Sequence, residues 1–244
     1  MPAEYGIIGY PLSHSFSPGY FAEKFAREGI DATYTAYPLQ HISDLPSLLK
    51  IHPHLRGLNV TIPHKEAVIP YLDELDADAA AVGAVNCIDI RNDRRKGYNT
   101  DIIGFEKSLK PLLKPHHCDA FILGTGGAAK AVAHVLDKLG ICYHFVSRTM
   151  SAKAMTYAML AANELLRKHK LIINTTPLGM HPEVHQYPEL PYHHMGHEHL
   201  CYDLIYNPAE TKFLVRSKER CATVMNGLDM LRIQAEASWE IWNG

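Results

Sequence analysis

The sequence predicts an α/β protein made of two units, each with a largely parallel sheet. Over the first hundred residues, short apolar runs alternate with helix-like segments, which is typical of parallel strands connected by helices. A second unit follows a break at Lys114-Pro115, where a strand, a glycine-rich turn and a helix come in succession. The apolar spacing of residues 225–242 predicts a last helix. We expect this helix to return to the unit in which the chain began.

In the first unit, strands are expected at residues 5–9, 33–37, 57–62 and 85–91. Helical segments are expected between and after them, at residues 17–29, 41–51, 65–71 and 77–82. The pair Ser17-Pro18 predicts an N-cap followed by proline at the first helical position, and Gly29 predicts the end of that helix. Asn92-Asp93 predicts a turn after the fourth strand.

In the second unit, a helix at residues 102–113 precedes strands at residues 120–123, 142–146, 171–174 and 201–205. A helix at residues 130–139 follows the glycine-rich turn and should end at Gly140. These elements predict one domain at residues 1–101 together with about 225–244, and a second at residues 102–224. Such a topology would leave a cleft between two α/β units, where ligands commonly bind.

The composition limits the classes of function. With 244 residues and 47% hydrophobic content, the chain can bury the core of one large domain or two modest ones. A net charge of −2 without a long basic run argues against nucleic acid as a partner. No apolar stretch is long enough to span a membrane, and the first residues lack the features of a secretory signal. Five scattered cysteines without a C-x-x-C pair indicate reduced thiols.

We therefore expect a cytoplasmic protein whose partner is a small molecule. The oligomeric state stays open, a homodimer included. The sixteen histidines include a group at His193, His194, His197 and His199 that could ligate a metal. That group lacks the helical H-x-x-x-H spacing and has no cysteine pair nearby, so solvated loop histidines are the favoured interpretation. We expect no metal.

The segment Gly124-Thr-Gly-Gly-Ala-Ala129 has the strand before it and the helix after it that a dinucleotide-binding turn requires. Gly124 would allow the tight turn, Gly126 would let the backbone approach a pyrophosphate, and Ala129 would occupy the close-packing position. The phosphates would lie at the helix N-terminus, facing free N–H groups. This pattern predicts a nucleotide site.

The choice of nucleotide depends on Ser147-Arg148-Thr149, about twenty residues past the glycines, at the end of the second strand. An NAD site usually carries an acidic residue there, and this sequence has none. A guanidinium with two hydroxyl groups suits a 2′-phosphate, which predicts NADP. The alternative is an arginine that only packs over the adenine edge.

Lys65 closes the run Asn59-Val-Thr-Ile-Pro-His-Lys65, which predicts a buried strand that ends in polar residues. A partly desolvated amine in such a place can act as an acid or a base. The alternative is a surface lysine in the first turn of a helix. Asp101, in Asn99-Thr-Asp101, would be an N-cap by itself. Beside Lys65 it would form an acid–amine pair near the cleft.

Hydroxyl groups gather in Ser13-His-Ser-Phe-Ser17-Pro18, at the predicted N-terminus of the first helix. Ser15 and Ser17 could hold a carboxylate without a full positive charge. Helix capping alone accounts for them equally well.

Taken together, these segments resemble the shikimate dehydrogenase family, and the resemblance runs in order over nearly the whole chain. The matching segments are His14-Ser-Phe-Ser-Pro18, Asn59-Val-Thr-Ile-Pro-His-Lys65, Gly83-Ala-Val-Asn86, Asn99-Thr-Asp101, Gly124-Thr-Gly-Gly-Ala-Ala129, Ser147-Arg-Thr149, Asn174-Thr-Thr-Pro-Leu-Gly-Met180, Asp203-Leu-Ile-Tyr-Asn-Pro208, and Asn226-Gly-Leu-Asp-Met-Leu231 with Gln234. The resemblance implies an N-terminal α/β substrate domain, a Rossmann-like NADP domain and a cleft that closes on binding.

The resemblance also implies roles for individual residues. Lys65 would be the catalytic acid–base, paired with Asp101, which would also hold a substrate hydroxyl. The substrate carboxylate would be bound by Ser15, Ser17 and Tyr206, and its ring hydroxyls by Thr61, Asn86 and Gln234. The cofactor would be bound by Gly124, Gly126, Gly127, Ala128, Ser147, Arg148 and Thr149, with Leu204 and Gly227 lining the nicotinamide pocket.

Two departures from the family pattern stand out. Ser147 occupies a position where the family usually has asparagine, and it keeps a hydrogen-bonding side chain. The segment between Thr149 and the strand at residue 171 is short for the family, which puts the adenine-side wall in doubt.

The implied reaction is reversible hydride transfer between NADPH and the ring carbonyl of 3-dehydroshikimate, an oxidoreductase step in aromatic amino-acid biosynthesis. One rival is a quinate/shikimate dehydrogenase with broader substrate or cofactor choice. A rival of another class is a Rossmann-type NADP sensor without catalysis, which would have no use for hydroxyl groups facing Lys65 and Asp101.

Overall fold

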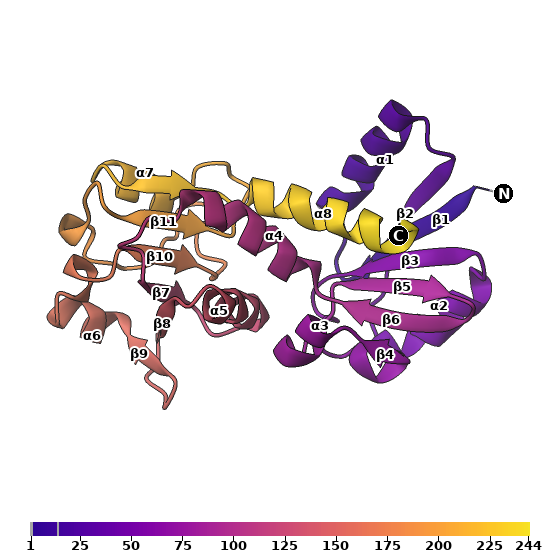
Figure 1. The fold of residues 1–244 in the computed structure, drawn as a ribbon, viewed down its shortest axis with the longest axis horizontal. Helices are drawn as coiled ribbons and strands as arrows, with labels where there is room; N and C mark the ends of the chain where they lie inside the picture. The colour runs from indigo at the N-terminus through magenta and orange to yellow at the C-terminus, as the bar shows by residue number, and fades with distance from the viewer. Residues whose placement is uncertain (1, 14) are drawn as a thin grey trace. The chain divides into compact units, whose positions relative to one another are not determined.

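The computed structural model describes residues 2–13 and 15–244, which form two compact units. Unit 1 consists of Met1–Thr100 with Ala235–Gly244, and unit 2 of Asp101–Gln234. Each unit contains one six-stranded sheet with helices, so the α/β fold is confirmed (Figure 1). Among the described residues, no helix combines the length and the apolar character needed to cross a membrane.

The sheet of unit 1 has the strand order β2-β1-β3-β5-β6-β4. Its strands are β1 (Ala3–Gly9), β2 (Ala32–Pro38), β3 (Leu55–Val60), β4 (Glu74–Leu75), β5 (Cys87–Arg91) and β6 (Arg94–Tyr98). β1 pairs in parallel with β2 and β3, whereas β5 runs antiparallel to both β3 and β6. The turn expected at Asn92-Asp93 joins β5 to β6, with φ of 51° and 61° at these residues. The sheet is therefore mixed.

The helical segments of unit 1 are α1 (Phe16–Glu28), η1 (Ile42–Asp44), α2 (Leu45–Ile51), η2 (Ile69–Tyr71) and α3 (Ala77–Val82). The predicted start of α1 is wrong by two residues, because Ser15 is the N-cap and Pro18 lies within the first turn. Proline is tolerated there because the N–H groups of that turn need no partner inside the helix.

The predicted helix at residues 65–71 is also wrong. Isolated turns occupy most of this segment, and only η2 is helical. Pro70 stands inside the predicted helix, where it lacks the N–H that an α-helix would use and its ring crowds the preceding turn.

The last helix, α8 (Leu228–Asn243), ends within unit 1, where Trp242 anchors it. The ring of Trp242 is 4% exposed, stacks on Tyr5 at 4.9 Å between centroids and donates a 2.9 Å hydrogen bond from Nε1 to the carbonyl of Ile88. A Cβ atom at Gly57 would lie 2.2 Å from Nε1 of Trp242. Gly57 therefore gives the indole its place against β3.

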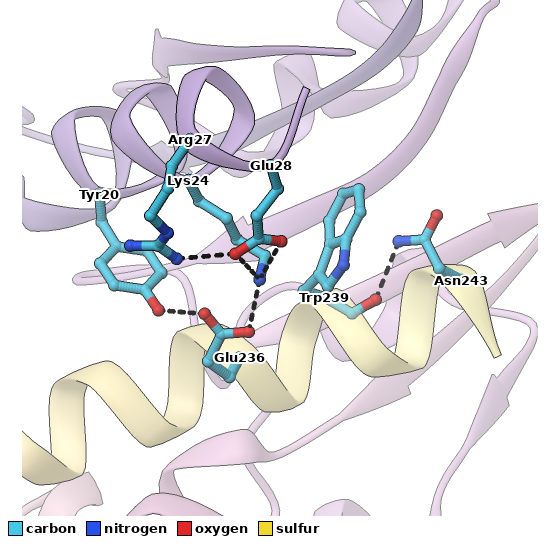
Figure 2. Close-up of polar contacts among 7 residues, drawn as sticks. All are labelled: Tyr20, Lys24, Arg27, Glu28, Glu236, Trp239 and Asn243. Atoms are coloured by element: carbon cyan, nitrogen blue, oxygen red, sulfur yellow. Dashed lines mark hydrogen bonds and ion pairs between the residues drawn. The ribbon is translucent and has the colours of Figure 1, made fainter. Parts of the chain in front are cut away.

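A cluster of charged groups joins α1 to the same end of α8, and Figure 2 shows its members pointing toward one another. Lys24 is 6% exposed and forms ion pairs with Glu236 at 2.8 Å and Glu28 at 3.0 Å. Tyr20 donates a hydrogen bond to Glu236. Burial lowers the pKa of Lys24, but the hydrogen bonds to Glu236 and Glu28 outweigh it and raise that pKa above its usual value. The ammonium group is thus held charged inside the unit.

A second polar network in unit 1 is buried. Asn59 accepts a 2.7 Å hydrogen bond from Tyr34 and donates one of 2.9 Å to Ser238. Thr100 lies 3.2 Å from Ser238 between hydroxyl oxygens, and its N–H donates a 2.6 Å hydrogen bond to Oδ1 of Asn86. This network links β2, β3, the start of α4 (Thr100–Leu109) and α8.

The sheet of unit 2 is parallel throughout, with the order β12-β11-β10-β7-β8-β9. Its strands are β7 (Asp119–Leu123), β8 (Cys142–Ser147), β9 (Ala154–Thr156), β10 (Leu171–Asn174), β11 (Leu200–Asp203) and β12 (Thr223–Met225). Besides α4, the helical segments within the unit are η3 (Lys110–Leu112), α5 (Gly127–Lys138), α6 (Tyr157–Ala162), η4 (Leu165–Arg167), η5 (Tyr192–His194) and α7 (Lys212–Lys218).

Three predicted helix starts in this part of the chain are wrong. α4 begins at Thr100 instead of residue 102, and Asn86 holds this first residue through its N–H and hydroxyl. α5 begins at Gly127 instead of residue 130, because Gly126 is the N-cap and Gly127, Ala128 and Ala129 belong to the first turn. α8 begins at Leu228 instead of residue 225, because Met225 belongs to the short strand β12. The short segment 150–170 folds as β9, α6 and η4.

The prediction of solvated loop histidines fails for His199, which is 1% exposed. Its Nε2 lies 2.7 Å from the carbonyl of Leu166, and its Nδ1 accepts a 3.0 Å hydrogen bond from the N–H of Gly196. This ring holds the loop against η4.

Asp203 organises the carboxyl ends of β10 and β11. Its carboxylate accepts hydrogen bonds from Thr211 at 2.5 Å, from Asn174 at 3.0 Å and from the N–H of Ile205 at 3.1 Å. Burial raises the pKa of Asp203 to about 6, and these hydrogen bonds oppose the rise without cancelling it. The folded chain therefore protonates Asp203 at a higher pH than an ordinary aspartate.

We predict that Glu236→Ala lowers the free energy of unfolding by about 1.5–3 kcal/mol, the usual contribution of a hydrogen bond to a charged group, because Lys24 loses one of its two carboxylate partners. Urea unfolding measures this loss. Arg27→Ala is the control, because Arg27 forms an exposed ion pair with Glu28 and such pairs contribute about 0–1 kcal/mol. Equal losses in the two variants would contradict the buried role of Lys24.

We also predict a pH-dependent difference between the wild type and Asp203→Asn. An unfolded aspartate titrates near ~3.9, so between pH ~4 and the folded pKa of about 6 the folded state binds more protons than the unfolded state. The free energy of unfolding of the wild type relative to Asp203→Asn should fall by about 2–3 kcal/mol as the pH rises through this window.

Urea unfolding at several pH values measures the difference. Glu219→Gln, at an exposed position, is the control and should follow the wild type. A constant difference between the wild type and Asp203→Asn would refute the prediction.

Candidate functional site

The residues singled out in the sequence form two groups, each within one unit. Unit 1 contains Ser15, Ser17, Thr61, Lys65 and Asn86. Unit 2 contains Asp101, Tyr206 and Gln234 together with every residue expected to bind the cofactor.

The group in unit 1 lies at the carboxyl ends of β1 and β3, which are parallel neighbours. The N–H of Thr61 donates a 2.9 Å hydrogen bond to the carbonyl of Ile8, which joins the ends of the two strands. The N–H of His64 donates to the carbonyl of Thr61 at 2.9 Å and closes a turn after β3. Polar side chains that follow neighbouring parallel strands gather at one edge of the sheet, where α/β proteins bind ligands.

Lys65 is half-buried and lies on this turn, outside any helix. Its carbonyl accepts a 2.7 Å hydrogen bond from the N–H of Val85. The alternative of a surface lysine in a helix's first turn is therefore wrong. The backbone of Lys65 is fixed, which a positioned acid–base requires.

His64 was not singled out in the sequence, yet it is 4% exposed and its Nε2 lies 2.6 Å from the carbonyl of Leu39. The ring thus joins the turn after β3 to the segment that follows β2. Its position next to Lys65 was the only signal in the sequence.

Asn86 is buried, and its Oδ1 accepts hydrogen bonds from the N–H of Thr100 at 2.6 Å and from the hydroxyl of Thr100 at 3.1 Å. Its amide oxygen is thus engaged inside the protein. Because Asp101 follows Thr100 directly, Asn86 sets the position of the first turn of α4.

The two serines at the start of α1 differ in their surroundings. Ser15 is the N-cap, is half-buried and makes no side-chain capping hydrogen bond. Ser17 is 6% exposed, and burial raises the pKa of Tyr34 while a hydrogen bond with Ser17 lowers it. Capping alone therefore accounts for neither hydroxyl. His14, the neighbour in the matching segment, lies outside the described residues.

In unit 2, the glycine turn connects β7 to α5. Gly124 has a φ of 109° and donates a 2.8 Å hydrogen bond from its N–H to the carbonyl of Val146. Gly126 is the exposed N-cap of α5, and a Cβ atom there would meet no atom within 4 Å. The packing of the protein does not need glycine at 126, whereas a pyrophosphate close to the backbone does. Gly127 and Ala128 begin the helix, and Ala129 is buried.

The end of β8 carries the residues expected at the 2′-phosphate. Arg148 and Thr149 are exposed, and the hydroxyl of Ser147 donates a hydrogen bond to the carbonyl of Thr149. Within residues 2–13 and 15–244, no carboxylate forms an ion pair with Arg148. Burial raises the pKa of Tyr157 to about 12 although the charge of Arg148 lowers it. The guanidinium thus lies near the start of α6 with room for an anion.

Leu204 and Gly227, expected at the nicotinamide, are in contact. A Cβ atom at Gly227 would lie 2.1 Å from the carbonyl oxygen of Leu204, so only glycine fits. They follow the carboxyl ends of β11 and β12. Because β7, β8, β11 and β12 are parallel, all the candidate cofactor residues share one edge of the sheet.

The remaining three residues occupy different elements of unit 2. Asp101 is the second residue of α4, Tyr206 follows β11, and Gln234 lies on α8. Tyr206 is half-buried, which raises the pKa of its hydroxyl. Gln234 is 7% exposed and donates a 3.0 Å hydrogen bond to the carbonyl of Leu231.

Comparison with known proteins places these observations in a family. Residues 7–88 match the family model described as the shikimate dehydrogenase substrate binding domain. The shikimate dehydrogenase (NADP(+)) of Desulforamulus reducens is 38% identical over 98% of this chain and 89% of that protein.

Solved structures agree over the full length. The shikimate 5-dehydrogenase of Thermus thermophilus, in complex with NADP(H) and shikimate, is 31% identical with a TM-score of 0.87, over 100% of this chain and 94% of that one. The 5-ketofructose reductase of a Gluconobacter strain is 29% identical with a TM-score of 0.84, over 99% of this chain and 93% of that one. On the identity and coverage of the Desulforamulus protein, the chain belongs to the shikimate dehydrogenase family.

Proposed function

We propose that this protein catalyses the NADP-dependent, reversible reduction of 3-dehydroshikimate to shikimate in aromatic amino-acid biosynthesis. One observation carries the proposal above the others: the chain is 38% identical to a shikimate dehydrogenase (NADP(+)) over 98% of its length and has the residues of both half-sites. The open glycine turn of unit 2 and the fixed lysine of unit 1 support it from the structure.

The two units divide the work in this proposal. Residues 1–101 with about 225–244 form the substrate-binding and catalytic domain, and residues 102–224 form the NADP-binding domain. The matched substrate-domain model at residues 7–88 and the glycine turn at residues 124–129 support this division.

NADP fits the residues at the edge of the unit 2 sheet. The N–H groups at the start of α5 would receive the pyrophosphate, and the positive end of the helix dipole favours its charge. Arg148 and Thr149 would hold the 2′-phosphate, with Ser147 fixing the loop. Leu204 and Gly227 would line the nicotinamide pocket.

Lys65 carries the proton in the proposed mechanism. NADPH, when bound, supplies the hydride to the ring carbonyl carbon. Negative charge then develops on the carbonyl oxygen, and the Lys65 ammonium donates a proton to it, which leaves a neutral amine and the hydroxyl of shikimate. In the opposite direction, neutral Lys65 removes the hydroxyl proton. Asp101 pairs with Lys65 and holds a substrate hydroxyl.

The other polar residues hold the substrate in this scheme. The carboxylate is bound by Ser15, Ser17 and Tyr206, which offer hydroxyl donors without a full charge. The ring hydroxyls are bound by Thr61, Asn86 and Gln234. Since Oδ1 of Asn86 is engaged with Thr100, Asn86 would use its amide N–H groups.

We also propose that the enzyme works in the cytoplasm. The described cysteines are all free thiols, and two of them, Cys87 and Cys201, are buried. We include a homodimer in the proposal. Light scattering after gel filtration measures the oligomeric state.

The function is tested by adding shikimate and NADP to the purified protein and following the absorbance of NADPH. Quinate, 5-ketofructose with NADPH, and NAD in place of NADP are run in parallel, because a family relative of 29% identity is a 5-ketofructose reductase. We expect the turnover rate to be highest with shikimate and NADP. NADP binding without any turnover would support the sensor instead.

We predict that Lys65→Ala lowers kcat by ~10²–10⁴-fold, the usual contribution of a positioned acid–base, and changes KM for shikimate little. Steady-state kinetics with saturating NADP measure both constants. Lys50→Ala, an exposed lysine of unit 1, is the control and should keep wild-type kcat. An unchanged kcat in Lys65→Ala would remove Lys65 from the mechanism.

We predict that Arg148→Ala raises KM for NADP by ~10–100-fold, because a charge-assisted hydrogen bond contributes about 1.5–3 kcal/mol. KM for NAD should change little, since NAD has no 2′-phosphate. Arg167→Ala, an exposed arginine of the same unit with a partner in Glu164, serves as the control. Equal changes for the two cofactors would mean that Arg148 only packs on adenine.

A further inference from the structure

Three side chains from distant parts of unit 2 meet at the amino-terminal half of its sheet. Asp119 is the first residue of β7, His144 lies within β8, and His169 precedes β10 by one residue. β7 lies between β8 and β10 in the sheet, which brings the three together. The glycine turn follows the other end of β7, so this cluster takes no part in cofactor binding.

The ligand atoms of these residues converge. Nε2 of His169 lies 3.2 Å from Oδ2 of Asp119, and Nε2 of His144 lies 3.6 Å from Oδ1. One atom from each of the three side chains can be chosen so that all lie within 4.8 Å of one another. The two imidazole rings meet edge to face, with centroids 5.5 Å apart.

The hydrogen bond on the far side of His169 fixes which nitrogen carries a proton. Its Nδ1 lies 2.8 Å from the carbonyl of Leu165, and a carbonyl only accepts, so Nδ1 is the donor. In the neutral ring, the lone pair of Nε2 would then face a carboxylate oxygen. A metal ion between Nε2 and Asp119 removes this repulsion, as a second proton on the ring also would. A backbone carbonyl bound to the second nitrogen is also the usual support of a metal-bound histidine.

Asp119 provides an independent observation. Its Oδ1 is buried and has no hydrogen-bond partner among the residues that the structure describes. Buried polar atoms nearly always have a partner, so an unpartnered carboxylate oxygen facing an imidazole nitrogen indicates a missing group.

We propose that Asp119, His144 and His169 bind a divalent transition-metal ion of the zinc class. In a tetrahedral zinc site with bonds of ~2.0–2.2 Å, two ligand atoms lie about 3.4 Å apart. Nε2 of His169 lies 3.2 Å from Oδ2 of Asp119 and Nε2 of His144 lies 3.6 Å from the other oxygen, Oδ1, so each histidine is near this spacing from the carboxylate. Two imidazoles with one carboxylate favour zinc over magnesium or calcium, which prefer oxygen ligands. The His144 side chain is 46% exposed, which leaves a fourth position for water.

The metal would join β7, β8 and the segment before β10, which also meet through the sheet and through ring contacts of Phe121, His144 and His169. Its role is therefore structural. The proposed dehydrogenase reaction does not use it.

The test starts from full-length protein freed of metal with a chelator. Zinc alone is titrated by calorimetry, and cobalt(II) is titrated by its visible absorption, which reports the coordination geometry. His144→Ala and His169→Ala should each weaken zinc binding at the tightest site by at least ~10-fold, the loss that even an outer hydrogen-bond partner of a metal ligand causes. Zinc should also raise the Tm of the wild type and not that of His169→Ala.

His193→Ala is the matched control, because His193 is exposed and meets another histidine, His194, edge to face at 4.2 Å between ring centroids. The His193→Ala variant should bind zinc at the tightest site with the affinity of the wild type. Should His169→Ala fail to fold, the exposed His144 and the variant Asp119→Asn still test the site. Equal zinc affinity in the wild type, His144→Ala and Asp119→Asn would overturn the proposal, as would the absence of zinc binding by the wild type.

Shikimate turnover should be the same with and without zinc, so failure of this proposal and failure of the proposed function are separate outcomes.

Discussion

The buried hydrogen bonds among Asn59, Asn86, Thr100 and Ser238 are the constraint on which the arrangement of the chain depends. The chain leaves unit 1 after Thr100 and re-enters it at residue 235, and both connections begin within this network. Each member is buried, so the loss of one removes a hydrogen bond from its neighbours in a dry environment. Within unit 1, the network thus fixes the end of β3, after which Lys65 follows, and Thr100, with which α4 begins.

The sequence was sufficient for the order of the elements and for most strands, because their apolar runs are buried on both faces of a parallel sheet. It was not sufficient for β6, whose Arg-Arg-Lys-Gly-Tyr sequence has no apolar run. It also missed β4, which has two residues, and β9 and β12, which have three residues each. Helix starts were predicted least accurately. Gly127 and Phe16 join helical turns because of the longer helices that continue from them, and the propensities of single residues do not reveal this.

The candidate site, too, could be predicted from the sequence only in part. Motifs and the family resemblance supplied the residues, since the chemistry of a lysine after a strand or of glycines before a helix is local. Contacts between distant segments were invisible in the sequence. The hydrogen bond of His64 to Leu39, the engagement of Asn86 with Thr100 and the approach of Asp119 to two histidines each depend on which strands become neighbours. Tertiary packing decides which strands become neighbours, and a single sequence does not report that packing.

The most direct test of the account is a crystal structure of the protein with shikimate and NADP bound. The account predicts that Nζ of Lys65 lies within hydrogen-bond reach, ~2.6–3.2 Å, of the hydroxyl that is oxidised, with the pyrophosphate on the N–H groups at the start of α5. A lysine amine that points into solvent, or a nicotinamide bound away from the substrate ring, would contradict it.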